Sequence, residues 1–114
     1  MLKIWVDDVR PAPEGRGYTW LTTVNQVKEY IIKREEIDKQ MKASGVYLHD
    51  VQIELIDLDY DAGSYAADGG DYIKILDWLE ETGRNYPIRI HSANPVGVEN
   101  MRRIIRRKGW TEAK

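Results

Sequence analysis

The stretch IRIHSANP (residues 88–95) decides how this chain folds, because a strand pattern gives way to a helix pattern within it. Its first three residues form an apolar run that is typical of a β-strand. Asn94 suits a helix N-cap, whose side-chain oxygen accepts a free backbone N–H of the first turn, and Pro95 suits the first helical position. A strand that ends in His91 and Ser92 and leads into a helix brings an imidazole, a hydroxyl and unpaired N–H groups to one edge. Such an edge suits a phosphate group.

The same alternation of strand and helix patterns extends through the rest of the chain. Short apolar runs predict strands at residues 2–6 and 53–58, with a weaker candidate at residues 18–21. Residues 9–17 and 62–70 have the proline or glycine content of loops. Strands that alternate with helices predict a small α/β domain whose sheet is largely parallel and whose crossovers are right-handed.

The helix ends are marked by residues that satisfy free backbone groups. Thr23 and Gln26 have the spacing of a capping box, in which each side chain accepts the other residue's backbone N–H, and Gly45 is a plausible stop for that helix. Asp71 is expected to cap a second helix, and the last helix is expected to end near Gly109.

The composition limits the class of protein. We expect one domain spanning residues 1–114 with a single modest core. A formal net charge of −2 gives no indication of a nucleic-acid or membrane partner, and the absence of cysteine excludes disulfides and thiolate metal sites. The N-terminus is too short and acidic for a signal peptide, and no apolar run approaches a membrane span. We therefore expect a cytoplasmic protein, and the sequence leaves its oligomeric state open.

Two pairs of carboxylates follow predicted strands. Asp7 and Asp8 come directly after the first strand, and Asp59 and Asp61 come after the strand at residues 53–58. Ligand sites of parallel sheets lie beyond the carboxyl ends of the strands, so the pairs are expected to converge there. Crowded carboxylates repel one another unless a cation neutralises them, and hard oxygen ligands select Mg²⁺, Mn²⁺ or Ca²⁺. A metal site is favoured over the alternative of solvated loop acids.

A calcium-binding loop is a weaker interpretation of the same segment. Asp57, Asp59 and Asp61 reproduce the spacing of the first half of an EF-hand loop. The sixth position is Ala62 instead of glycine, the twelfth is Asp68 instead of a bidentate glutamate, and a strand precedes the loop where a helix is required. These three departures argue against an EF-hand.

The two histidines differ in their settings. His91 alone is most simply a half-buried structural residue, but beside Ser92 and a helix N-terminus it becomes a candidate general acid or phosphate ligand. A nucleophilic serine–histidine dyad is disfavoured because adjacent residues on a strand point to opposite faces. His49 has no comparable setting and is interpreted as structural.

A basic run at residues 102–108 flanks the apolar stripe of the last helix. Cations are favourable near a helix C-terminus, so a solvated helix face explains the run better than a nucleic-acid surface. No sequence-specific binding to nucleic acid is expected.

Taken together, these motifs closely resemble the cyclic-phosphate processing receiver-like family, small bacterial and phage-borne domains related in fold to response-regulator receivers. The resemblance runs nearly end to end and rests on DDVRPAP, LDYD, DWLE after a glycine-rich entry, and HSANPVG (residues 7–13, 58–61, 77–80 and 91–97). It implies a three-layer receiver-like (flavodoxin-like) fold with a mostly parallel sheet of four to five strands. It also implies a hydrolytic role on cyclic phosphates.

The resemblance also assigns positions. Asp7 and Asp8 match the acidic pair that ends the first receiver strand, Asp59 matches the position of the receiver phosphoacceptor, and the pair His91-Ser92 falls where receivers carry Ser or Thr. Tyr60 is a departure, because the family usually has histidine there. A second departure concerns the receiver's final strand, with the lysine that contacts the phosphoryl group. Neither has an evident counterpart here, which weakens the case for phosphorelay signalling.

The expected function is metal-dependent hydrolysis of a cyclic phosphodiester, either a cyclic nucleotide or a 2′,3′-cyclic end. The expected ligands of Mg²⁺ or Mn²⁺ are four carboxylates: Asp7, Asp8, Asp59 and Asp61. Asp8, Asp59 and His91 are the expected catalytic residues, with His91 protonating the leaving oxygen. Whether Asp59 is a metal ligand or a nucleophile stays open.

The expected phosphate-binding residues are Arg10, Ser92 and Asn94 together with the helix N-terminus. Arg10 either pairs with a second phosphate edge or neutralises the acidic pairs. The expected partner is a small phosphate-containing ligand. The competing interpretation is a non-catalytic receiver-like module that binds a phosphorylated ligand or accepts a phosphoryl group and changes its partners.

Overall fold

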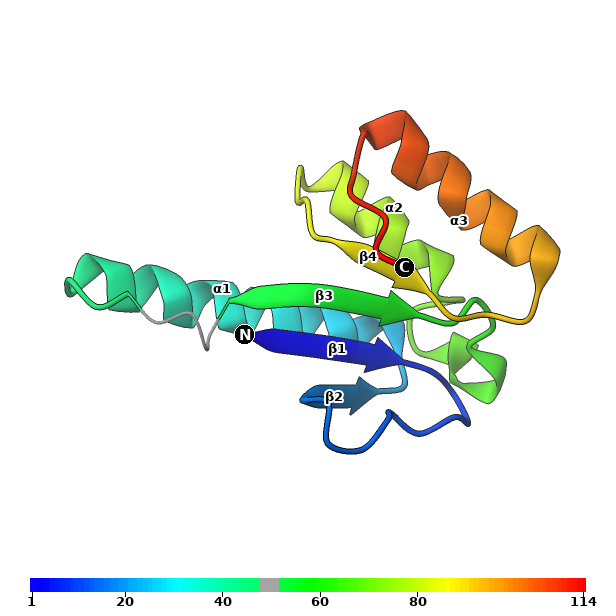
Figure 1. Cartoon of the computed structure of the whole chain (residues 1–114), viewed down its shortest axis with the longest axis horizontal. Helices are drawn as coiled ribbons and strands as arrows, with labels where there is room; N and C mark the ends of the chain where they lie inside the picture. The colour runs from blue at the N-terminus through cyan, green and yellow to red at the C-terminus, as the bar shows by residue number, and fades with distance from the viewer. Residues whose placement is uncertain (48–51) are drawn as a thin grey trace.

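The computed structural model describes residues 1–47 and 52–114, and it contains one parallel sheet packed against helices (Figure 1). The described strands are β1 (Leu2–Val6), β2 (Tyr18–Leu21), β3 (Ile53–Leu58) and β4 (Ile88–Ile90), in the order β2-β1-β3-β4. Every neighbouring pair is parallel. This confirms the expected α/β receiver-like class. His49 and the predicted extended segment around it lie outside the described residues.

The helices are α1 (Val24–Ala43), α2 (Ile73–Glu81) and α3 (Pro95–Lys108), with a short 3-10 helix, η2 (Gly63–Ala67). Although α1 has 20 residues, no helix in the described part of the chain is long and apolar enough to span a bilayer. The segment predicted to be a loop, residues 62–70, contains the η2 turn. Its first residue, Ala62, is fully buried.

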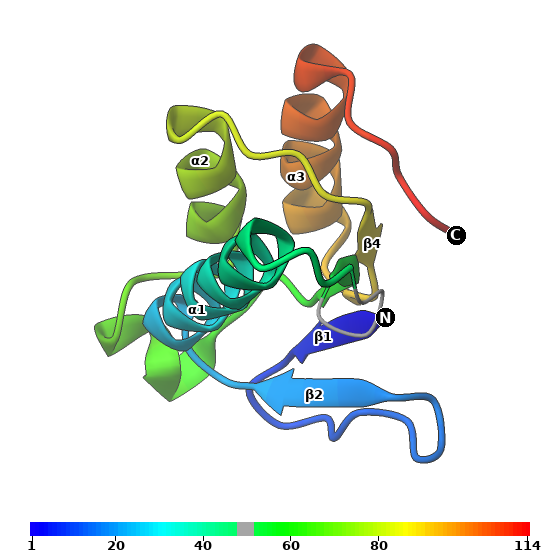
Figure 2. The same cartoon turned by 90° about the vertical axis from the view of Figure 1, so that its left-hand side faces the viewer.

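All three helices pack on one face of the sheet (Figure 2). The steps from β2 to β3 and from β3 to β4 advance in the same direction across the sheet, so right-handed crossovers place α1 and α2 on the same face. After α3 the chain continues in that direction, because Glu112 forms a parallel bridge with Ile88 of β4. The step from β1 to β2 runs the other way and contains no helix. No helix of the described chain packs on the second face, where the Trp5 indole donates to the Arg10 carbonyl at 2.8 Å.

Strand alternation gives the two faces different compositions. Ile4 and Val6 of β1 and Ile56 and Leu58 of β3 point into the helical layer, where they join a single apolar core with α1, α2 and α3. The second face carries an aromatic and charged set at the intervening positions: Lys3, Trp5, Tyr18, Trp20, Asp57 and Arg89. Polar chemistry is thus concentrated on the face that has no helices.

Most predicted helix ends are confirmed. The Thr23–Gln26 capping box is present, Asn94 accepts the Gly97 N–H at 3.1 Å, and Gly109 ends α3 in the left-handed conformation. The prediction for Asp71 is wrong, because α2 begins after Tyr72 without a side-chain cap. Asp71 instead accepts the backbone N–H of Ala62 at 3.2 Å and so holds the η2 segment.

Candidate functional site

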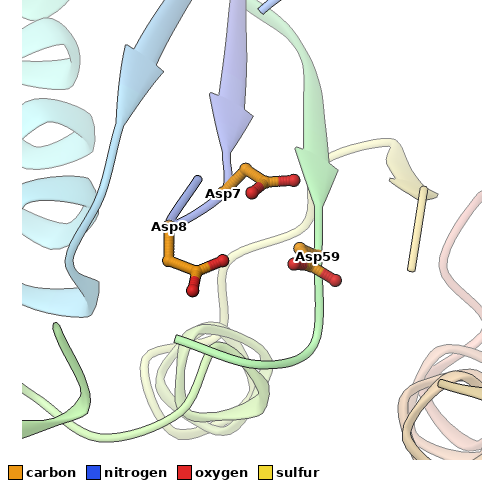
Figure 3. A group of neighbouring side chains, drawn as sticks. All are labelled: Asp7, Asp8 and Asp59. Atoms are coloured by element: carbon orange, nitrogen blue, oxygen red, sulfur yellow. The ribbon is translucent and has the colours of Figure 1, made fainter. Parts of the chain in front are cut away.

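Three aspartates meet at the carboxyl edge of the sheet (Figure 3). One oxygen from each of Asp7, Asp8 and Asp59 lies within 4.8 Å of the others. The sheet itself produces this convergence, because β1 and β3 are neighbours and the register pairs Val6 with Leu58. The backbone ladder continues one residue further, since the Asp59 N–H donates to the Val6 carbonyl at 2.9 Å. The predicted convergence of the two strand ends is therefore confirmed for these three residues, which we call the acidic cluster.

The members of the acidic cluster differ in burial and charge. Asp7 is 1% exposed, whereas Asp8 and Asp59 are half-buried. Burial, together with the charges of Asp7 and Asp59, raises the pKa of Asp8 above its ordinary value. In the described part of the chain, no lysine or arginine forms an ion pair with Asp8 or Asp59. Among the described residues, the Asp8 and Asp59 carboxylates therefore have no cationic side chain paired with them.

Asp7 is held at both of its carboxylate oxygens. Its Oδ1 accepts the backbone N–H groups of Val9 at 2.9 Å and Arg10 at 2.7 Å, and its Oδ2 lies 3.0 Å from His91 Nε2. Burial raises the pKa of Asp7, but the two backbone N–H groups and His91 outweigh it and bring the pKa below its ordinary value. Asp7 is therefore an ionised carboxylate in a fixed orientation.

The acidic cluster fits a hard divalent cation. Its donors are carboxylate oxygens, the type that Mg²⁺ and Mn²⁺ prefer, and the charge of Asp8 and Asp59 is what such an ion would neutralise. The η2 backbone also approaches it closely, since a Cβ atom at Gly63 would lie 2.5 Å from Asp8 Oδ2. Gly63 has φ +58°, so glycine meets both the steric and the backbone requirement.

Asp61, which the sequence also predicts as a metal ligand, is not part of the acidic cluster. It is exposed, and the group of three that the structure brings together among the described residues excludes it. The chain turns after Asp59 toward the buried Ala62, which carries Asp61 to the surface. The regular spacing of Asp57, Asp59 and Asp61 therefore does not correspond to one site.

His91 lies beneath the acidic cluster, between two carboxylates. Its Nδ1 is 2.6 Å from Asp57 Oδ1, and its Nε2 is 3.0 Å from Asp7 Oδ2. The ring also stacks on Trp5, with centroids 3.7 Å apart and planes 6° apart. The side chain is only 7% exposed. Both nitrogens are therefore used within the protein, and the ring is not open to a ligand in this structure.

Asp57 is the buried carboxylate that the sequence analysis did not place in the site. It is fully buried near the end of β3, where its Oδ2 accepts hydrogen bonds from Tyr18 Oη at 2.9 Å and Arg89 Nη1 at 2.9 Å. Burial raises the pKa of Asp57, but hydrogen bonds from His91, Arg89 and Tyr18 bring it below its ordinary value. An aspartate inside an apolar strand, with an arginine in the next strand, was the available signal. Only strand register shows that the two residues are paired.

The predicted phosphate-binding residues lie around the junction of β4 and α3. Ser92 Oγ accepts the Asn94 N–H at 3.2 Å, and Asn94 Oδ1 accepts the Gly97 N–H, so both side chains shape the start of α3. The exposed Arg10 reaches across from the end of β1, and its Nη1 lies 3.4 Å from the His91 carbonyl. Arg10 is therefore a cation at the rim and makes no ion pair with the acidic cluster within the described residues.

Tyr60, where the resembled family usually has histidine, packs against the first turn of α3. A Cβ atom at Gly97 would lie 2.3 Å from Tyr60 Cγ, so the aromatic ring rests directly on the helix backbone. Position 60 thus connects the end of β3 with the start of α3. In this chain a neutral phenol fills that place.

Comparison with known proteins gives a family match that covers most of the chain. A family model described as cyclic-phosphate processing receiver domain matches residues 2–107, which include the acidic cluster, Asp57 and His91. No curated protein and no solved structure gave a match to the chain. The family match covers most of the sequence and all four strands of the described sheet. The chain therefore belongs to the cyclic-phosphate processing receiver domain family.

Proposed function

We propose that this protein is a metal-dependent phosphoesterase that opens a cyclic phosphodiester, such as a cyclic nucleotide or a 2′,3′-cyclic end. The observation that carries the proposal is the acidic cluster at the carboxyl edge of the sheet. Asp7, Asp8 and Asp59 would hold Mg²⁺ or Mn²⁺. When bound, such an ion supplies a Lewis acid for the phosphoryl oxygens and lowers the pKa of a coordinated water.

The protein's own residues supply orientation and charge around that position. Arg10, an exposed guanidinium at the rim of the same edge, would bind a non-bridging phosphate oxygen. The N-terminus of α3, shaped by Ser92 and Asn94, adds the positive end of a helix dipole beside it. These groups favour a ligand with a compact anionic group, which supports a phosphate over a neutral substrate.

His91 contributes to this proposal by fixing Asp7. The backbone N–H groups of Val9 and Arg10 hold one oxygen of Asp7, and His91 holds the other, with Asp57 behind the ring. A preorganised carboxylate binds a metal without first losing rotational freedom. To protonate a leaving oxygen, His91 would have to leave one of its carboxylate partners. Positioning is therefore the role that its contacts favour over general acid catalysis.

The second candidate function is a phosphate-accepting receiver module. One observation favours it: Asp59 ends β3 beside the acidic pair of β1, the place that the receiver phosphoacceptor has in the resembled fold. One feature weighs against it, because in the described chain only a single bridge, from Glu112 to Ile88, follows α3 where a final strand would be. The hydrolase remains the better supported proposal.

The experiment measures turnover of 2′,3′-cyclic and 3′,5′-cyclic mononucleotides and cyclic dinucleotides with Mg²⁺, with Mn²⁺ and with EDTA. We expect metal-dependent ring opening that is lost in Asp8→Asn and kept in the control Asp77→Asn, an aspartate on α2 paired with Lys74. Turnover that persists in EDTA or in Asp8→Asn would contradict the metal site. If no cyclic substrate is opened, and acetyl phosphate adds one phosphate that Asp59→Asn abolishes, the receiver function replaces the hydrolase.

A further inference from the structure

Trp20 is an aromatic side chain exposed beside the acidic cluster. It lies on β2, the edge strand, and is 43% exposed. The other tryptophans are more enclosed: Trp5 and Trp110 are buried, and Trp78 is half-buried with the Arg84 guanidinium over its ring. Tryptophan is usually largely buried, because its ring gains much from leaving water. Trp20 is the most exposed tryptophan of the described chain.

The Trp20 ring is anchored at its polar atom. Its Nε1 donates to the backbone carbonyl of Asp7 at 2.8 Å, which turns the indole toward the edge where the acidic cluster lies. This hydrogen bond satisfies the only polar atom of the side chain, so the exposed part of the ring is apolar carbon surface. The anchor also restricts the ring's rotation. Trp20 is thus held next to the proposed metal ligand Asp7 and does not swing freely in solvent.

The topology leaves the Trp20 face open. Trp20 pairs in register with Trp5, so both point to the second face of the sheet, which no helix covers. Trp5 is enclosed because His91 stacks on it and Tyr18 packs against its edge. Within residues 1–47 and 52–114, Trp20 makes no ring contact with another aromatic side chain. Two adjacent tryptophans therefore have different environments, one internal and one facing outward.

We propose that the open face of Trp20 stacks on the nucleobase of a nucleoside phosphate whose phosphate lies at the acidic cluster. The inference rests on the proposed function for the position of the phosphate, and it narrows the substrate class from any cyclic phosphate to one that carries a base. Every nucleobase has a π-face, and stacking on an aromatic side chain reads no base edge. The site is therefore tolerant of base identity and selective against ligands that lack a base.

The test measures binding, so that it does not depend on turnover. Dissociation constants for 3′-AMP and for ribose 5-phosphate are measured by calorimetry in the presence of Mg²⁺, for the wild type, Trp20→Ala and Trp20→Phe. Trp20→Ala should weaken 3′-AMP binding by about 10- to 100-fold, the range for loss of one stacked base. Ribose 5-phosphate binding should change by less than about twofold, and Trp20→Phe should recover most of the lost 3′-AMP affinity because phenylalanine keeps an aromatic face.

The matched control is Tyr47→Ala. Tyr47 is 72% exposed and lies between the end of α1 and the start of β3, away from the carboxyl ends of the strands, so its loss should change neither constant. If Trp20→Ala weakens the binding of 3′-AMP and of ribose 5-phosphate equally, the stacking role is overturned, because the substitution has then damaged the phosphate site. A shift in oligomeric state on gel filtration in Trp20→Ala would also overturn it and assign Trp20 to a subunit contact. If the protein opens no cyclic phosphate but binds 3′-AMP through Trp20, the proposed hydrolase activity is refuted and the stacking role of Trp20 is supported.

Discussion

Replacing Asp57 with asparagine tests the buried charge network beneath the acidic cluster. In the wild type, Asp57 Oδ1 faces His91 and Oδ2 accepts from both Tyr18 and Arg89. Asparagine has one oxygen and one NH₂ group, so its NH₂ group can face His91 Nδ1 only if that nitrogen carries no proton, and otherwise it faces the Tyr18 and Arg89 donors. The substitution also removes the negative charge that balances Arg89. Asp57→Asn therefore leaves Arg89 without its anionic partner and restricts the tautomer of His91.

The expected cost follows from the burial of each partner. Removing one member of a buried ion pair costs about 3–5 kcal/mol, because the remaining charge loses its partner without regaining water. The Arg89 side chain is 41% exposed and can turn toward solvent, whereas His91 cannot. We therefore expect Asp57→Asn to lower the free energy of unfolding by about 3 kcal/mol, toward the lower end of that range. For a domain whose total is about 5–15 kcal/mol, the loss is large.

Urea unfolding followed by circular dichroism measures this loss, and two variants calibrate it. Tyr18→Phe removes only the neutral donor and should cost about 1 kcal/mol. Asp77→Asn, in an exposed pair on α2, should stay within about 0.5 kcal/mol of the wild type. A loss below about 1 kcal/mol in Asp57→Asn would refute the reasoning, because His91 and Arg89 would then not need the buried carboxylate.

The same variant predicts a pH dependence. The pKa of Asp57 lies below its ordinary value of 3.8 in the folded protein, so its stabilisation is fully present above that value and is lost as the pH falls through the folded pKa. The difference in unfolding free energy between the wild type and Asp57→Asn should therefore shrink below about pH 4. A difference that grows on acidification would mean that Asp57 is protonated in the native state.

Three further predictions concern the acidic cluster. In thermal unfolding, Mg²⁺ or Mn²⁺ should raise the melting temperature of the wild type and of Asp61→Asn but not of Asp8→Asn. If Asp8→Asn responds to the metal as the wild type does, a shared site is excluded. Gly63→Ala should abolish the metal response, because its Cβ would meet Asp8 Oδ2. It should also destabilise the folded protein by about 1 kcal/mol or more, because φ is positive at this position. A wild-type metal response in this variant would show that η2 can move away from Asp8. His91→Ala should reduce metal affinity and turnover by about 10- to 100-fold, equally on a cyclic nucleotide and on a nitrophenyl phosphodiester. A much larger loss on the cyclic substrate would make His91 a general acid instead.

The sequence predicts those parts of the site that depend on local order. Parallel strands end at one edge, so carboxylates after two neighbouring strands converge, as Asp7, Asp8 and Asp59 do. Capping is equally local, and the predicted caps at Thr23 and Asn94 are present. Asp71 shows the limit, because a carboxylate near a helix start can bond any free N–H within reach. It bonds Ala62, nine residues earlier in the chain.

The partners of His91 could not be predicted, because they depend on strand register. Asp57 meets His91 only once β3 and β4 pair with Asp57 beside Arg89, and no local pattern specifies that register.

The layers of the domain raise a similar problem. The expected receiver-like architecture implies helices on both faces of the sheet, but here all three helices lie on one face. Proline and glycine in residues 9–17 predict a loop after β1, but not that the second face has no helix.

The position of β1 between β2 and β3 has a consequence for folding. Leu2 pairs with Ile53, so this pairing joins residues that are far apart in sequence, whereas β3 and β4 are linked through a shorter crossover. Closing so long a segment is slow compared with forming α2 or α3. Asp7 and Asp8 come together with Asp59 only when that closure is complete. A bound ion would therefore slow unfolding, and any acceleration of refolding by Mg²⁺ would show that β1 is already paired with β3 in the transition state.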